Sequence, residues 1–308
     1  MIRVFYPESK LLSPSQRRIR SGLLKYCIIP ISIVDDSKKA DIHIYDYFGY
    51  DFLNPPKCDI PLKPLTRNYV VLYHCPPPPN VSPIVIEKLD KILRGAKLVI
   101  TFTKFFTFYS GYHPFKLNYK DINFYITPWG FDPQIFYPEQ TSKEYDLGFM
   151  GLVDESERIR DIYLAVKKLR VNAIHLCGQS LRDVEQVVKD VDSPYVKRVG
   201  YLSDDELRLT YAKCKYFASF RMHVGFELPV IESAACGSQP LTLDFPCYRE
   251  HFNDIAIFIN PRDVVNSLIN VISSGKTRNI DFNYVRLKFS WEFIAPKIWN
   301  RILEVIKA

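Results

Sequence analysis

The sequence is poor in glycine, has no paired-cysteine motif and contains no long apolar run. Glycine accounts for only 12 of the 308 residues. No apolar run approaches the ~20 residues that span a bilayer, which argues against a transmembrane protein. The opening segment MIRVFYPESK lacks the charged head and long apolar stretch of a secretory signal, so we expect a cytoplasmic protein.

The cysteines and histidines do not form a disulfide framework or a metal site in the sequence. The seven cysteines are scattered, odd in number and without a C-x-x-C pair, and segments such as IHLCG and ESAACG are typical of buried, reduced thiols. The DVD at 190–192 follows a helical pattern, which favours a solvated loop over a metal-binding motif. We therefore expect no metal and no bound cofactor.

The basic charge suits an anionic partner. The formal net charge is +7 and the isoelectric point is near 8.9. Phosphorylated small molecules, nucleic acid and acidic membrane surfaces all fit this charge, and so does a generic basic surface. No aromatic-basic motif supports nucleic acid, which we do not expect as a partner. The segment PSQRRIRSGLLK predicts a basic helix that either contacts an acidic membrane or an anionic acceptor, or is simply solvated.

Short apolar runs alternate with helical patterns almost from end to end, as in NYVVLYH, KLVITFT and NAIHLCG. Strands that alternate with helices indicate parallel sheets with crossover connections, hence an α/β fold. Prolines and a glycine interrupt this pattern in the middle of the chain. We predict an N-terminal domain over 1–125, a linker over 126–142, a C-terminal domain over 143–289 and a closing helix over 290–308.

Capping residues predict where three of the helices begin. Asp154 with Glu157 has the spacing of a capping box, and so does Ser203 with Glu206. Ser290 stands in front of the closing helix and is expected to cap it. These starts are local predictions, because a capping box needs only residues three positions apart.

The stretch RMHVGFELPVIESAACGSQPL predicts a strand-to-helix turn with an open helix start. Its helix LPVIESAACG has Pro229 at the first position, and Leu228 before it cannot cap with its side chain. The first backbone amides then lack an obvious partner, and such a helix start at the end of a parallel strand can bind phosphate. The alternative is that Glu227 or water satisfies the amides and that Gly225 merely makes the turn. Glu232 could accept sugar hydroxyls, although an exposed helix glutamate is the commoner role.

Several stretches, in the right order, resemble retaining glycosyltransferases of the family-4 type. VGFELPVIESAACGSQP is similar to the donor-site segment of that family, and ITPWGFDPQIFYP resembles its interdomain phrase. GYLSDDELRLTYAKCKYF and FSWEFIA match two further segments. These matches span residues 123 to 295, whereas the first 120 residues match only in strand pattern and in His74. The resemblance implies the GT-B fold, in which two Rossmann-like domains face each other across a cleft.

The resemblance also implies a donor site in the C-terminal domain. Glu232 would bind the ribose hydroxyls of a nucleotide sugar, and Leu202 would hold the base through its backbone. The segment from Gly225 through Phe226 to Leu228 would hold phosphate and sugar oxygens. The expected partner is therefore a UDP- or GDP-sugar.

The same resemblance implies an acceptor side and a catalytic set. His74, in the N-terminal domain, would face the reacting carbon and the acceptor, which could be a saccharide, a lipid or a protein. Glu227, at a position where the family usually has a glycine, and Arg221 are the other expected catalytic residues. Stabilisation of the departing diphosphate would be electrostatic and independent of a metal ion.

Two positions depart from the family pattern. Val224 stands where the family has its first glutamate, and Leu152 stands where an arginine usually follows a strand. Phosphate would then be neutralised by Arg158, Arg160 or Arg221. The departures keep two alternatives to a retaining hexosyltransferase open. One is a catalytically impaired module that binds nucleotide sugars, and the other is a nucleotide-sugar epimerase on the same fold.

Overall fold

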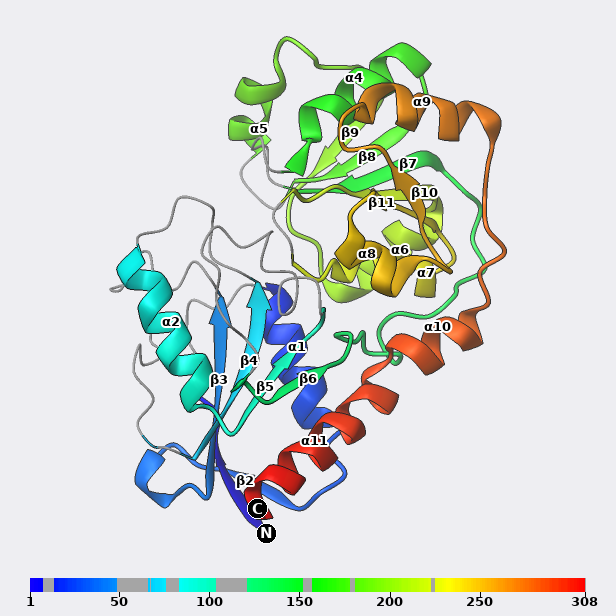
Figure 1. The fold of residues 1–308 in the computed structure, drawn as a ribbon. Helices are drawn as coiled ribbons and strands as arrows, with labels where there is room; N and C mark the ends of the chain where they lie inside the picture. Colours follow the sequence, from blue (N-terminus) through cyan, green and yellow to red (C-terminus); the bar gives the residue numbers. More distant parts are fainter. Residues whose placement is uncertain are drawn as a thin grey trace. The chain divides into compact units, whose positions relative to one another are not determined.

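The computed structural model describes residues 1–7, 14–48, 66, 68–75, 83–103, 121–151, 157–177, 181–222 and 225–307. These residues form two compact units (Figure 1). The first unit contains residues 1–130 and 291–308 together with Gly225 and Phe226, and the second contains most of the chain from Phe131 to Ser290. Leu152, Asp154 and Val224, which carried predictions, lie outside the described residues.

The first unit is built on a six-stranded parallel sheet with the strand order β2-β1-β3-β4-β5-β6. Its strands are β1 Ile2–Phe5, β2 Ile31–Ile33, β3 Ile42–Phe48, β4 Tyr69–Cys75, β5 Leu98–Thr101 and β6 Phe124–Ile126. Its helices are α1 Pro14–Lys25, the 3-10 turn Ser37–Lys39, α2 Pro83–Gly95 and α11 Trp291–Lys307. Val70, Val71 and Leu72 of β4 are fully buried, as expected for a central parallel strand covered on both faces.

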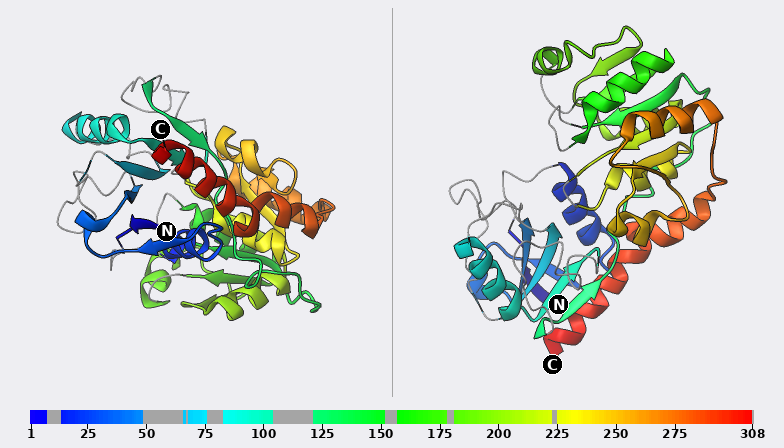
Figure 2. Two further views of the ribbon diagram at one scale, coloured as in Figure 1. Left: turned by 90° about the horizontal axis from the view of Figure 1, so that it is seen from below. Right: turned by 45° about the horizontal axis from the view of Figure 1, so that its top comes forward.

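The last helix of the chain packs on the first helix. Helices α11 and α1 lie side by side in each view of the ribbon (Figure 2). Trp299 Nε1 donates to the carbonyl oxygen of Leu23 at 2.7 Å. A Cβ on Gly22 would come within 2.1 Å of Trp291 Cδ1, so this close approach requires glycine. The closing helix therefore belongs to the first unit.

Ser290 does not cap this helix. It is instead the C-cap of the preceding helix α10, where its amide donates to Arg286 O. The Ser290 hydroxyl has no hydrogen-bond partner among the residues that the structure describes. The predicted Ser290 cap is therefore wrong, because its hydroxyl accepts from none of the described amides at the start of α11.

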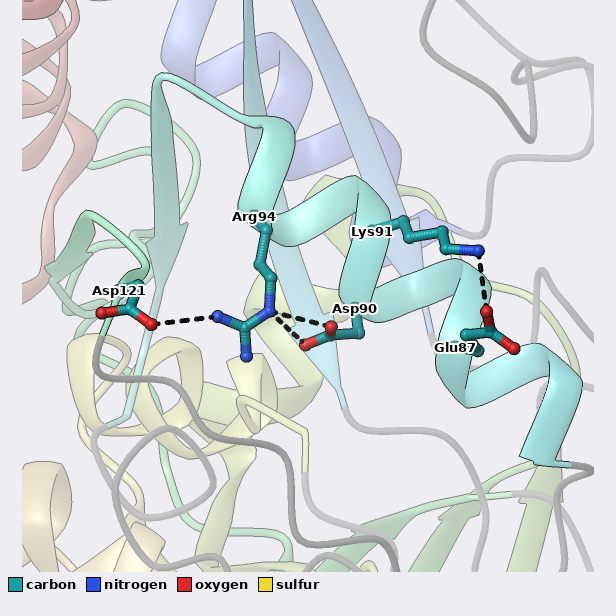
Figure 3. A network of polar contacts seen from close by, with 5 residues as sticks. All are labelled: Glu87, Asp90, Lys91, Arg94 and Asp121. Carbon is teal, nitrogen blue, oxygen red and sulfur yellow. Dashed lines mark hydrogen bonds and ion pairs between the residues drawn. The ribbon is translucent and has the colours of Figure 1, made fainter.

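Helix α2 carries a network of ion pairs on its exposed side (Figure 3). Arg94 Nε donates to Asp90 Oδ2 at 2.8 Å, and its Nη1 lies 3.5 Å from Asp121 Oδ2, which precedes β6. Lys91 donates to Glu87 at 2.7 Å, one turn away along the helix. Most of these side chains are exposed, so solvent screens the pairs and each adds little to the stability of the fold.

The second unit also contains a six-stranded parallel sheet, with the order β12-β11-β10-β7-β8-β9. Its strands are β7 Tyr145–Met150, β8 Ala173–Leu176, β9 Val196–Val199, β10 Cys214–Ser219, β11 Gln239–Leu243 and β12 Ile257–Ile259. Its helices are α4 Ile159–Leu169, α5 Leu181–Val188, α6 Asp204–Lys213, α7 Leu228–Ala235, α8 Pro246–Phe252, α9 Val264–Ser274 and α10 Phe282–Phe289. The predicted α/β fold with parallel sheets is confirmed in both units.

Two helix starts in this unit test the capping predictions. The Ser203–Glu206 box is confirmed, with both reciprocal hydrogen bonds present. Helix α4 instead has Arg158 as its N-cap, in a left-handed conformation with φ 54° and no side-chain cap. Glu157 accepts from Arg221 Nη2 at 2.9 Å. Its predicted box partner Asp154 lies outside the described residues, so the Asp154–Glu157 box stays a prediction.

Candidate functional site

Polar side chains of the second unit gather where three neighbouring strands end. Strands β7, β10 and β11 are adjacent and parallel, so their carboxyl ends lie on one edge of the sheet (Figure 1). Gly151 follows β7, Ser219 ends β10, and Arg221 lies two residues beyond it. Tyr248 belongs to α8, which follows β11. This edge is where open α/β sheets bind ligands.

Glu227 is the buried centre of this cluster. Its side chain is 4% exposed and accepts from Ser219 Oγ at 2.6 Å and from Tyr248 OH at 3.4 Å. Although Glu227 is the N-cap of α7, its side chain makes no capping hydrogen bond. Its carbonyl oxygen accepts from Val230 N at 3.1 Å. The Glu227 carboxylate is therefore not the partner of the first α7 amides.

Arg221 lies between two buried carboxylates. Its Nη2 is 2.9 Å from Glu157 Oε1 and its Nε is 3.6 Å from Glu227 Oε1. The Glu227 charge, followed by that of Glu157, raises the pKa of Arg221 above its usual 12.5. The arginine side chain is still 47% exposed, whereas its partners are 10% and 4% exposed. Arg221 can thus present N–H groups to an anion while both carboxylates fix its orientation.

Gly151 and His175 fix the backbone at the carboxyl end of β7. Gly151 has φ 154°, and a Cβ there would lie 2.3 Å from Glu157 Oε2, so only glycine fits beside that carboxylate. His175 is fully buried, and burial lowers its pKa to about 4. The neutral ring therefore donates from Nε2 to Gly151 O at 3.0 Å and accepts from Tyr163 OH at Nδ1, also at 3.0 Å. These bonds hold the end of β7 in place.

The three arginines proposed as phosphate ligands lie in different surroundings. Arg160 pairs with Asp190 on the surface, and that hydrogen bond raises its pKa. Arg158 pairs with Asp161 at the start of α4 and directly follows Glu157 in the chain. Only Arg221 is joined by described contacts to the Glu227 cluster, so it is the best placed of the three.

Glu232 is not the exposed helix glutamate that its residue type favours. It is 1% exposed, in the second turn of α7, and accepts from Tyr211 OH of α6 at 3.0 Å. Leu228, the first residue of α7, is 3% exposed. Leu202 is partly buried between β9 and the Ser203 cap, at the carboxyl end of its strand. A ribose that bound Glu232 would therefore have to compete with Tyr211.

His74 lies in the first unit, at the end of β4. Its Nε2 is 2.7 Å from Asp46 Oδ1, and both side chains are 3% exposed. The ring of Trp129 packs against the imidazole with centroids 5.0 Å apart. Gly225 and Phe226 are also grouped with the first unit. The structure therefore divides the predicted site residues between the two units.

Comparison by sequence alone relates only part of this chain to a protein of known activity. No family model matches it. It is 28% identical over 115 residues to a serotype-specific mannosyltransferase, WbdA, of Escherichia coli. That match covers 34% of this chain and only 14% of the mannosyltransferase.

Solved structures match far more of the chain. Sucrose-phosphate synthase from Thermosynechococcus elongatus superposes with a TM-score of 0.70 at 15% identity, covering 88% of this chain and 75% of that one. HepE of Anabaena, solved with UDP and glucose, gives 0.61 at 12% identity and covers 100% and 98%. The pneumococcal O-GlcNAc transferase GtfA, solved with UDP and GlcNAc, gives 0.59 at 13% identity and covers 78% and 53%. The chain has the GT-B fold.

The two candidate clusters contain residues that the sequence did not reveal. Glu157, Ser219 and Tyr248 surround Arg221 and Glu227, and Asp46 and Trp129 surround His74. One signal was available for Asp46, since a carboxylate in the buried strand pattern DIHIYDY needs a partner.

The described residues contain neither a metal-like cluster nor a membrane span. Within the described ranges, no group of three or more histidine, cysteine or carboxylate side chains could hold a metal ion. In the 190–192 segment, Asp190 pairs with Arg160 and Asp192 pairs with Arg198. No described helix is both long and apolar enough to cross a bilayer.

Proposed function

We propose that this GT-B chain is a glycosyltransferase, which moves a hexose from a nucleotide sugar to an acceptor. The observation that carries the proposal is Arg221, half exposed between the buried carboxylates of Glu157 and Glu227 at the carboxyl edge of the second sheet. The mannosyltransferase match and the solved transferases that hold UDP with a sugar support the same class.

The donor would bind to the second unit through its diphosphate. Arg221 would donate to phosphate oxygens from one side, and the uncapped start of α7 would offer backbone amides from the other. The Leu202 backbone would hold the base, and Glu232 would accept ribose hydroxyls in exchange for Tyr211. A GDP- or UDP-sugar fits these groups equally well.

The chemical step would be electrostatic. The bond between the sugar carbon and the phosphate oxygen breaks, the acceptor oxygen forms the new bond, and its proton leaves with the diphosphate product or its solvent shell. Arg221 and the α7 amides would stabilise the charge that develops on the departing oxygen. Glu157 and Glu227 would act as positioning residues, because they touch Arg221. Retention of configuration and independence from metal ions are parts of this proposal, and the addition of EDTA should leave transfer unchanged.

A thermal-shift screen with UDP, GDP and their common sugar conjugates tests the proposal. A nucleotide sugar should stabilise the wild type, and Arg221→Ala should weaken its binding at least about tenfold, as expected for the loss of a hydrogen bond to a charged group. Lys213→Ala is the matched control, because Lys213 pairs with Glu144 at the opposite, amino edge of the same sheet. No stabilisation by any nucleotide at millimolar concentration would contradict the proposal.

Buried Glu232 favours a second candidate, a nucleotide-sugar-binding module without turnover. Glu232, which should meet the ribose, is 1% exposed, and one of its two carboxylate oxygens accepts from Tyr211. Such a module would bind a nucleotide sugar without hydrolysing or transferring it. An epimerase would instead convert the bound sugar without an acceptor, so analysis of the products after prolonged incubation separates all three activities.

A further inference from the structure

A chain of hydrogen bonds crosses the second unit and ends beside the residues proposed to bind the donor. Its middle members are Tyr163 of α4 and His175 of β8, which are both fully buried. Arg198 of β9 forms one end, where its Nη2 pairs with Asp192 at the surface. Gly151, which follows β7, forms the other end. The bonds therefore connect three elements of the unit to the carboxyl edge of its sheet.

The donating and accepting capacity of each group fixes the direction of these bonds. An arginine side chain can only donate, so Arg198 Nε donates to Tyr163 OH at 3.1 Å. The Tyr163 hydroxyl then directs its own proton to His175 Nδ1, 3.0 Å away. A carbonyl oxygen can only accept, so His175 Nε2 donates to Gly151 O at 3.0 Å. Both neighbours of the imidazole therefore require the tautomer with its proton on Nε2.

Gly151 is fixed to β8 through both of its backbone groups. Its amide donates to Leu176 O at 3.3 Å, and its carbonyl oxygen accepts from His175. The Glu157 carboxylate lies directly against this glycine, since a Cβ there would come within 2.3 Å of Glu157 Oε2. The other oxygen of that carboxylate, Oε1, accepts from Arg221 Nη2 at 2.9 Å. A shift of the Gly151 backbone would therefore move the carboxylate that orients Arg221.

We infer that Arg198, Tyr163 and His175 form a positioning relay for the donor site. Through Gly151, the relay holds Arg221 in the orientation in which its guanidinium meets the diphosphate. Electrostatic stabilisation of a leaving group depends on donors that are in place before the bond breaks, so a small displacement of this arginine weakens both binding and transfer. The inference rests on the proposed function and adds residues that act on the donor only through their neighbours.

Two substitutions of His175 separate positioning from simple core packing. In His175→Gln the side-chain amide can still donate to Gly151 O, whereas His175→Leu fills the space without a donor. We expect calorimetry with the nucleotide sugar that stabilises the wild type to give a nearly unchanged Kd for the glutamine variant. The leucine variant should bind about fivefold more weakly, as expected for the loss of one neutral hydrogen bond. An unchanged Kd in the leucine variant, or an equal loss in both variants, would overturn the inference.

Turnover tests the order of the relay. Because Arg221 is proposed to stabilise the departing diphosphate, His175→Leu should lower kcat and raise the donor KM while the acceptor KM stays unchanged. Tyr163→Phe separates Arg198 from His175 but leaves the bond to Gly151 O, so its losses should lie between those of the wild type and of His175→Leu. A larger loss in Tyr163→Phe than in His175→Leu would contradict the relay.

His43 of the first unit provides a matched control, because its contacts are of the same kind. In this buried strand histidine, Nδ1 lies 2.8 Å from Tyr45 OH and Nε2 lies 3.0 Å from Ser37 O. His43→Leu should therefore lower stability, as His175→Leu does, without changing the donor Kd or kcat. If His43→Leu weakens donor binding as much as His175→Leu, the effect is a general loss of stability and the inference fails.

Nitrogen NMR tests the relay in the protein alone. Burial lowers the pKa of His175 to about 4, so its ring is neutral at pH 7. Long-range proton–nitrogen spectra distinguish the two neutral tautomers, and His175→Gln identifies the signals of this residue among the six histidines. The proton should lie on Nε2. A proton on Nδ1 would overturn the inference, because Gly151 O would then receive no hydrogen bond from the ring.

The outcomes separate the relay from the proposed function. If a nucleotide sugar binds the wild type and His175→Leu binds it equally well, the relay is wrong and the glycosyltransferase proposal stands. If no nucleotide sugar binds the wild type, the proposed function fails, and the assignment of a donor-positioning role to His175 fails with it.

Discussion

The two units place polar side chains at the same point of the same fold but use different chemistry there. The second unit holds a charged group, Arg221 with Glu157 and Glu227, in which the cation is about half exposed. The first unit holds a hydrogen-bonding group, Asp46 with His74 and Trp129, in which every side chain is at most 3% exposed. Charge that remains accessible suits a phosphate, whereas the buried Asp46–His74 hydrogen bond is already satisfied within the unit. The carboxyl edge of a parallel sheet therefore fixes where a site forms, and the residues that end each strand decide what it binds.

The units can be separated experimentally, because all three tryptophans, Trp129, Trp291 and Trp299, belong to the first one. Tryptophan fluorescence should therefore follow the first unit, while circular dichroism follows both. If the unfolding transitions seen by fluorescence and by circular dichroism differ for a variant, that variant has destabilised one unit alone.

The largest expected effect is that of Gly22→Val. The new side chain would collide with Trp291, whose Cδ1 lies 2.1 Å from the Cβ position, and would push α11 from α1. Overpacking of this severity should cost at least about 3 kcal/mol. Fluorescence should report unfolding at a much lower temperature than the wild type, with the second unit still folded by circular dichroism.

Gly200→Ala is the control for that variant. A Cβ on Gly200, in the second unit, would meet nothing within 4 Å, so both transitions should stay near those of the wild type. Simultaneous loss of both transitions in Gly22→Val would contradict the prediction that this damage stays in the first unit.

The next largest effect is the loss of stability of the second unit as the pH falls. Burial lowers the pKa of His175 from 6.5 to about 4, so above pH 6.5 the residue is neutral whether the chain is folded or unfolded. As the pH falls from 6.5 towards 4, the unfolded chain binds a proton that the folded chain does not, and stability decreases. The loss is about 3 kcal/mol by pH 4, at about 1.4 kcal/mol for each pKa unit.

Denaturation by urea between pH 7 and 4, followed by circular dichroism, measures this slope, and His175→Gln should flatten it. Other carboxylates contribute to acid sensitivity, so the decisive quantity is the difference in slope between the wild type and the variant. If stability depends equally on pH in the wild type and in His175→Gln, His175 is not the cause of the acid sensitivity.

Local signals made much of the fold predictable. Central strands such as NYVVLYH are recognisable because both faces of a parallel sheet are buried, and the Ser203–Glu206 box needs only four residues. Strand β6 has no clear strand pattern in the sequence, because it has three residues, all partly buried, at the edge of its sheet. Similarly, CIIPISIV indicates a longer strand than Ile31–Ile33, since a parallel edge strand pairs only as far as its neighbour extends.

The candidate sites were less predictable because their contacts are long-range. Glu157 has the spacing of a capping residue, yet it binds Arg221, 64 positions away. Asp46 and His74 are 28 positions apart and meet only through the register of β3 and β4. Glutamate is usually exposed on a helix, yet Glu232 is buried with most of α7 and accepts from Tyr211 of α6. Residue types could suggest the chemistry, but only the sheet could show which residues meet.

The smallest expected effect is a change in the affinity of the second unit for a nucleotide diphosphate in Glu227→Gln. With both carboxylates ionised, the Arg221 group of the second unit carries a net charge of −1, which opposes a diphosphate. The amide can still accept from Ser219 and lacks the charge. Removal of one negative charge close to the ligand is worth on the order of 1 kcal/mol, or roughly fivefold in Kd. The variant should therefore bind the nucleotide diphosphate more tightly by calorimetry, with the gain reduced at high salt.

The same variant should turn over more slowly if Glu227 positions Arg221, because one of the two carboxylates that orient the guanidinium has lost its charge. Tighter binding with slower transfer would mean that Glu227 orients Arg221 and does not itself contact the donor. Weaker binding would instead mean that Glu227 itself contacts the donor, as a glutamate that accepts sugar hydroxyls would. Asp244→Asn is a suitable control, since Asp244 follows β11 at the same edge but pairs with Arg249 outside the cluster. A general electrostatic effect of the edge would appear in both variants, whereas a specific role of Glu227 would appear in one.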